Sequence, residues 1–209
     1  MKHLKILGLA AVAAMALSAF AASPASAGVS MLYNGTTTLG AGSKLDFSVP
    51  SGGSVNLVDT SGNSLDKCST STLKAFVLNS EGLLEIEESV DIPGGQVTYG
   101  LTWSGCTFTT KTIYSGFLEV LWNSGTTGTV RTNLSTEVTI NTGLFGSCIY
   151  VLFGGTQVGT LTTASSGAAT FDVNAVATRS GSNAACPATA KWTGTYTSTE
   201  PSNLRVEKE

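Results

Sequence analysis

Apolar and polar residues alternate with a period of two along much of the chain, which is the pattern of a β-strand that buries one face. The longest such stretch is 130–140, where Val, Leu, Val and Ile stand at even positions and polar residues at odd ones. We expect one strand of eleven residues there. Residues 97–103 and 188–196 alternate in the same way, each with a Trp on its apolar face, and predict two further strands.

Shorter stretches predict further strands with one buried face; these are 45–49, 55–58, 73–78, 84–90, 158–163, 171–177 and 204–206. Residues 113–122 and 148–153 are apolar on both faces, which is typical of central strands covered on two sides. The Thr-rich segment 36–39 predicts a light strand near the beginning of the domain.

Clusters of Gly, Pro, Asn and Ser separate these stretches, for example at 50–53, 61–63 and 180–183, where such residues favour turns. The 30 Thr and 24 Gly residues favour strands and turns over helices, and no later segment has a helical period. The sequence therefore predicts an all-β fold, an antiparallel β-sandwich or jelly roll, in a single domain that spans residues 28–209.

The first 27 residues have the pattern of a secretory signal peptide. Lys2 and Lys5 precede an apolar run at 6–22, and Ala25-Ser26-Ala27 matches a small-x-small cleavage site. We therefore expect a secreted, extracellular or cell-envelope protein. No second long apolar run follows, so we expect no membrane span.

Charge and histidine content exclude several functions for the mature chain. Without Lys2 and Lys5, nine basic residues stand against fourteen acidic ones, a net charge of −5, which excludes a basic nucleic-acid binder. The only histidine, His3, leaves with the signal peptide. Triads and zinc sites that depend on imidazole are therefore excluded.

The four cysteines, Cys68, Cys106, Cys148 and Cys186, predict two disulfides, because their number is even and the destination is oxidising. The equal spacing of 38 residues in each consecutive pair favours Cys68–Cys106 and Cys148–Cys186 over the two other connectivities. Each disulfide would close a loop of nearly forty residues, which would stabilise the folded state by about 4 kcal/mol in the chain-entropy model. The sequence contains no C-x-x-C pair, so it does not indicate a zinc site.

Three segments of the chain resemble segments of known proteins. They are 143–150, which reads Gly-Leu-Phe-Gly-Ser-Cys-Ile-Tyr, 103–107, which reads Trp-Ser-Gly-Cys-Thr, and the segment 186–206, which runs from Cys186 to the last expected strand. On these motifs the chain resembles small secreted actinobacterial β-sandwich proteins with four cysteines. It is more distantly similar to the secreted activators of alkane oxidation. Neither resemblance implies catalytic residues, and the distant one implies an apolar ligand.

Five acidic residues crowd into eleven positions: Glu81, Glu85, Glu87, Glu88 and Asp91. Glu85 and Glu87 would share one face of a strand, as the two carboxylates of a retaining glycosidase must lie close together. The same carboxylates are hard ligands that suit Ca²⁺, although no EF-hand spacing is present. A solvated acidic edge that resists sheet-to-sheet pairing explains them more simply, so we expect no cofactor.

Trp103, Trp122 and Trp192 are the candidate ligand-binding residues, since carbohydrate modules on β-sandwiches display aromatic rings to sugars. Trp103 and Trp192 stand on the apolar side of their alternating stretches. Core packing is therefore the better explanation for them.

We expect a non-enzymatic secreted or cell-surface structural or interaction protein. The alternatives are a binding module for a glycan or apolar ligand, and a carboxylate-dependent glycosidase. The end strands at 204–206 and 36–39 would offer unpaired backbone groups, which predicts self-association through edge strands.

Overall fold

A computed structural model describes residues 30–78, 83–86, 100–113, 116–132, 136–141, 146–164 and 167–208. These residues contain strands and no helix, and every pairing is antiparallel, which confirms the predicted all-β class. The strands are β1 (Ser30–Asn34), β2 (Thr37–Thr38), β3 (Lys44–Ser48), β4 (Val55–Val58), β5 (Ser64–Val77), β6 (Leu83–Ile86), β7 (Gly100–Cys106), β8 (Thr109–Ile113), β9 (Gly116–Ser124), β10 (Thr127–Thr132), β11 (Thr136–Asn141), β12 (Ser147–Leu152), β13 (Gln157–Thr162), β14 (Thr170–Ser180), β15 (Thr189–Glu200) and β16 (Leu204–Lys208).

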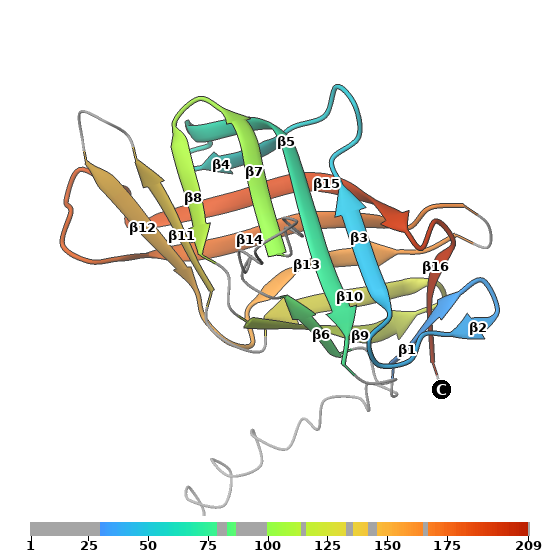
Figure 1. The fold of residues 1–209 in the computed structure, drawn as a ribbon. Helices are drawn as coiled ribbons and strands as arrows, with labels where there is room; N and C mark the ends of the chain where they lie inside the picture. The colour runs from blue at the N-terminus through green and yellow to red at the C-terminus, as the bar shows by residue number, and fades with distance from the viewer. Residues whose placement is uncertain are drawn as a thin grey trace, which may run out of the picture.

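Eight of these strands form a sheet that closes on itself. Hydrogen-bonded pairing runs β3, β5, β6, β9, β10, β13, β14, β15 and back to β3. In Figure 1, β3, β5 and β7 form the front layer, and β13, β14 and β15 cross behind it. Closure gives each of these eight strands a hydrogen-bonded neighbour on both sides.

Three long strands, β5, β14 and β15, extend beyond this closed sheet and support a second group of strands. Residues 64–68 of β5 pair with β4, and residues 68–74 pair with β7. The far end of β14 pairs with β12, which continues to β11 and β8. Strands β3 and β4 therefore lie one after the other along the same pair of neighbours, β5 and β15.

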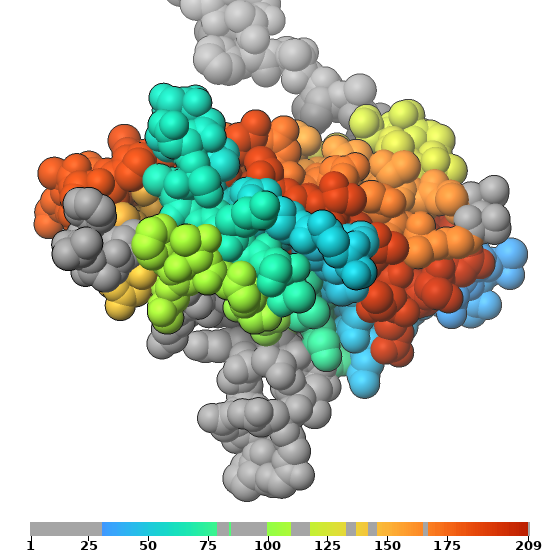
Figure 2. All heavy atoms as spheres, turned by 90° about the horizontal axis from the view of Figure 1, so that it is seen from above, coloured from blue at the N-terminus to red at the C-terminus, as the bar shows by residue number. Residues whose placement is uncertain are grey.

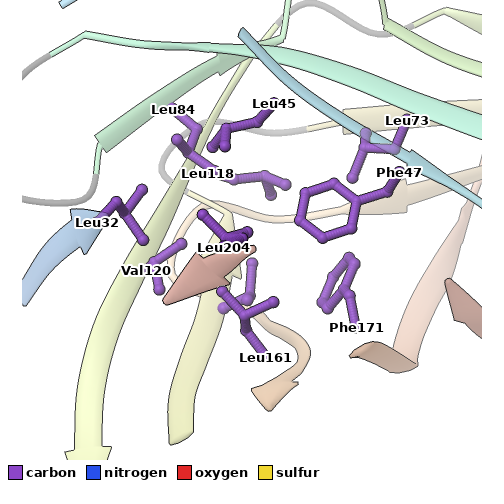
Figure 3. A pocket seen from close by; sticks show the side chains of 11 residues that line it. Leu32, Leu45, Phe47, Leu73, Leu84, Leu118, Val120, Leu161, Phe171 and Leu204 are labelled. Carbon is purple, nitrogen blue, oxygen red and sulfur yellow. The ribbon is translucent and has the colours of Figure 1, made fainter. Parts of the chain in front are cut away.

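A separate three-stranded sheet, ordered β16-β1-β2, covers one end of the closed sheet. Leu32 of β1 and Leu204 of β16 point among the core side chains of β3, β9 and β13 (Figure 3). Val206 N donates to Thr163 Oγ1 at 3.4 Å, which ties β16 to the end of β13. The C-terminal strand is therefore part of the core rather than a free tail.

The predicted single strand at 130–140 is wrong. Its two halves belong to β10 and β11, which pair with different neighbours: β10 with β9 and β13, β11 with β8 and β12. Val130, Val138 and Ile140 all point inward, because both strands bury the same alternate positions. An unbroken alternation of apolar and polar residues is the same for one long strand as for two consecutive strands that both bury the even-numbered positions.

Burial on β12 also differs from the prediction for 148–153. Cys148, Tyr150 and Leu152 are buried, but Ile149 and Val151 between them are only half-buried, and Phe153 beyond the strand is 58% exposed. The strand thus has one covered face. The strand expected at 97–103 is observed as β7 from Gly100 onward, and residues 97–99 lie outside the described part.

Both predicted disulfides are confirmed. Cys68 and Cys106 stand directly opposite each other on β5 and β7. Cys148 on β12 is joined to Cys186 in the β14–β15 connection, and Arg179 Nη1 donates to the carbonyl oxygens of Asn183 and Cys186 in that connection. The second bridge therefore anchors a loop that Arg179 also holds.

Candidate functional site

Two of the three candidate tryptophans pack against each other, Trp192 fully buried and Trp103 partly buried. Trp192 on β15 is 3% exposed, and Trp103 on β7 packs against the core with its ring centroid 5.9 Å from that of Trp192. Neither indole N–H has a hydrogen-bond partner among the residues that the structure describes. These rings pack against each other and do not form a surface platform.

Trp122 on β9 occupies a different environment. It is half-buried, its Nε1 donates to Gly125 O at 3.1 Å, and Lys208 Nζ lies 5.6 Å from the ring centroid. The ring therefore packs under the end of β16, with a cation on its face.

Of the five clustered acids, only Glu85 falls within the described residues, on β6 opposite Phe76 and Phe117. Glu81, Glu87, Glu88 and Asp91 lie outside them. The predicted metal or catalytic constellation therefore has no described geometry.

The side-chain ligand atoms of Asp66, Cys68 and Cys106 lie within 4.8 Å of one another, but both sulfurs are used in the disulfide. Asp66 Oδ1 instead accepts hydrogen bonds from the backbone N–H groups of Lys67 and Phe108 at 2.8 and 3.1 Å. This buried carboxylate orders the β7–β8 turn.

An apolar space lies between the layers of the closed sheet, where leucines, valines and two phenylalanines converge (Figure 3). The cavity that they leave measures about 10 Å³. That is about the volume of one water-sized sphere, so an apolar ligand does not fit beside the side chains as they are packed.

Hydroxyl side chains follow one continuous row around the outer face, which we call the hydroxyl belt. Each member stands directly opposite the next on a neighbouring strand, and none is buried: Ser124, Thr127, Thr162, Thr170, Thr197, Ser48, Thr72 and Thr102. At its end, Thr72 Oγ1 and Thr102 Oγ1 are hydrogen-bonded at 2.6 Å. The outer face is therefore polar but almost uncharged along this row.

A second row runs beside the belt, with Thr129, Thr160, Asp172 and Thr195 opposite one another on β10, β13, β14 and β15. Thr195 Oγ1 donates to Asp172 Oδ1 at 2.7 Å. This row ends at β15, because the next position falls between the end of β3 and the start of β4.

The interruption between β3 and β4 opens a groove of about 460 Å³ on the outer face, which we call the polar groove. The turn after β3 forms one wall, with Gly53 N donating to Pro50 O at 2.9 Å, and β14 and β15 form the other. Figure 2 shows the cyan-to-teal β3–β4 segment against the orange and red of β14 and β15. Its lining residues are Pro50, Gly53, Ser54, Asn56, Asp172, Val173, Thr193, Gly194 and Thr195.

Gly194 allows β4 to lie directly against β15 beneath this groove. A Cβ at Gly194 would stand 2.7 Å from Val55 Cγ1, which is too close for carbon atoms. Because Gly194 has no side chain, β4 and β15 pair closely enough for Asn56 and Thr193 to stand opposite each other.

The polar side chains of the groove were not among our candidates. Their signal is present in the sequence as Thr at every second position of 193–199, which marks the outer face of β15. Their convergence with Asn56 and Asp172 depends on strand register across β4, β14 and β15, which no local pattern encodes.

No family model, no curated protein and no solved structure matches this chain. In the described part of the chain, no segment forms a helix of the length and apolarity that a membrane crossing requires.

Proposed function

We propose that the chain is a non-enzymatic secreted or cell-surface protein with a structural or interaction role. The observation that carries this proposal is the outer face: a belt of eight hydroxyl side chains in register, with a polar groove beside it. Such a surface is suited to many hydrogen bonds with a hydrophilic partner.

The compartment is part of the same proposal. Two disulfides are compatible with an oxidising, extracellular location, and the signal-peptide pattern of residues 1–27 supports secretion. The outer face would then be the surface that contacts a partner in this compartment.

Binding without chemistry also agrees with the composition of the groove. Asp172 is the only ionisable residue among the nine that line it, whereas glycoside hydrolysis uses a pair of carboxyl groups. The groove can hold hydroxyl groups, and its described lining residues do not provide the second carboxyl group that cleavage requires.

The test is to secrete the full chain from a bacterial host, isolate the processed protein and incubate it with a panel of polysaccharides. We expect a mature N-terminus at Gly28 and no new reducing ends. Reducing ends that disappear in both Glu85→Gln and Glu87→Gln would instead establish the glycosidase alternative.

A further inference from the structure

We propose that the polar groove is a binding site for a neutral glycan. The inference rests on the proposed function, because it names the partner class of an interaction protein. The groove volume of about 460 Å³ lies within the range of about 300–1,000 Å³ that small-molecule sites occupy.

Asp172 is positioned to accept hydroxyl donors. Thr195 Oγ1 occupies one acceptor position on Oδ1 at 2.7 Å and fixes the orientation of the carboxylate. An ionised carboxylate has about four acceptor positions, so it can accept a pair of adjacent sugar hydroxyls while it keeps Thr195.

Asn56 and Thr193 supply the complementary donors from the floor of the groove. Asn56 Nδ2 lies 3.4 Å from Ser54 Oγ, and Thr193 Oγ1 lies 3.5 Å from Asn56 O. Both distances are at the long end for hydrogen bonds, so a ligand can replace these contacts at small cost.

The charge of the groove selects the class of ligand. A single carboxylate with no cationic residue among the nine lining residues disfavours anionic ligands. Ca²⁺ takes six to eight oxygen ligands, usually with several carboxylates, which one Asp and one Asn do not provide. A neutral polyol needs both donors and acceptors, and the groove offers both.

The second outer row extends the site across the sheet. From Thr195 and Asp172 it continues to Thr160 on β13 and Thr129 on β10, with strands about 4.8 Å apart. Hydroxyls at this repeat favour an extended ligand, so oligosaccharides should bind more tightly than a single sugar.

The test measures binding of soluble neutral glucans, mannans and galactans to the mature, oxidised protein by calorimetry, with sulfated dextran as the anionic arm. The variants are Asp172→Asn and Thr195→Val in the groove and Thr160→Val in the extension. The matched control is Thr178→Val, an exposed residue of β14 six positions beyond Asp172.

We expect a neutral glycan to bind and both groove variants to lose about tenfold to a hundredfold in affinity. Thr160→Val should weaken oligosaccharides but not the single sugar, and Thr178→Val and a chelator should change nothing. Loss of binding in chelator would overturn direct recognition by the side chains.

Three other outcomes would also overturn the inference: binding that the groove variants retain, preference for sulfated dextran, or no binding of any neutral glycan. They leave the proposed function standing. That function fails separately, if the bound glycan is recovered cleaved.

Discussion

Ser71 Oγ on β5 and Tyr196 Oη on β15 lie 2.8 Å apart, although 125 residues separate them in the sequence. Both side chains are buried, directly behind the turn that leads from β3 to β4. There β5 and β15 have no strand between them, and this hydroxyl pair links them from the inside. The polar groove lies on the outer side of the same interruption.

Removing this link should destabilise the fold measurably. We expect Ser71→Ala and Tyr196→Phe each to lower the free energy of unfolding by about 1 kcal/mol. Because the two hydroxyls interact, the double variant should cost less than the sum of the single variants. Urea denaturation of all four proteins measures this coupling, and strict additivity would show that the two hydroxyls act independently.

The C-terminal strand should be essential for stability. Val206 is 0% exposed, whereas Val176 on β14 is 53% exposed. Val206→Ala should therefore lower the free energy of unfolding by about 1.5–3 kcal/mol. Val176→Ala should change the free energy of unfolding by no more than about 0.5 kcal/mol. Equal denaturation midpoints for these two matched variants would place β16 outside the core.

Each disulfide should contribute substantially to stability. Replacing Cys148 and Cys186 together with Ser should lower the free energy of unfolding by about 2–5 kcal/mol, since the bridge closes a long loop. Denaturation under oxidising conditions measures the loss. Peptide mapping of the unreduced protein is the control, and a Cys106–Cys148 peptide as the main species would contradict the observed pairing.

One carboxylate should make stability depend on acid pH. A hydrogen bond from the Asn63 side chain, then backbone bonds from Asn63, Ser61 and Gly62, hold the pKa of Asp59 below its usual range. Its stabilising contribution is therefore present above the usual Asp pKa and is lost as the pH falls through the lowered one.

NMR titration tests this pH dependence. In Asn63→Ala the pKa of Asp59 should rise toward its usual value, whereas Asn174→Ala, a change of an exposed Asn on β14, should leave it in place. An identical Asp59 titration in the Asn63 variant would show that the side-chain bond has no effect.

Self-association through an end strand stays a prediction. Leu204 and Val206 are buried, so deletion of residues 200–209 would damage the core and is a poor test. The exposed strand β2 at Thr37–Thr38 is a better site, and Thr38→Pro would remove a backbone donor there. Sedimentation at high concentration should show less association in this variant; an unchanged monomer fraction would exclude β2 as the contact.

Local patterns predict those parts of the fold that depend on one strand at a time. The strand expected at 55–58 is observed as β4, and 158–163 and 171–177 fall within β13 and β14 to within a few residues. The equal spacing of the cysteines predicts both disulfides. The prediction succeeds because each consecutive pair of cysteines lies on neighbouring parts of the fold.

Features that depend on several strands escape such patterns. The division of 130–140 between β10 and β11 requires knowledge of their separate partners. Predicting the hydroxyl belt requires the register of eight strands. Predicting the polar groove requires knowing that β3 and β4 pair with the same two strands. The sequence makes the tryptophans candidate binding residues, yet Trp192 is buried in the core and Trp103 packs against it, partly buried.

The most direct test of this account is an NMR titration of the ¹⁵N-labelled mature protein with neutral oligosaccharides. We predict shifts confined to backbone signals of residues 50–56, 172–173 and 193–195, with extension toward Thr160, and unchanged indole N–H signals for Trp103 and Trp192. Shifts centred on those two indoles, with the groove signals unmoved, would contradict recognition at the outer face.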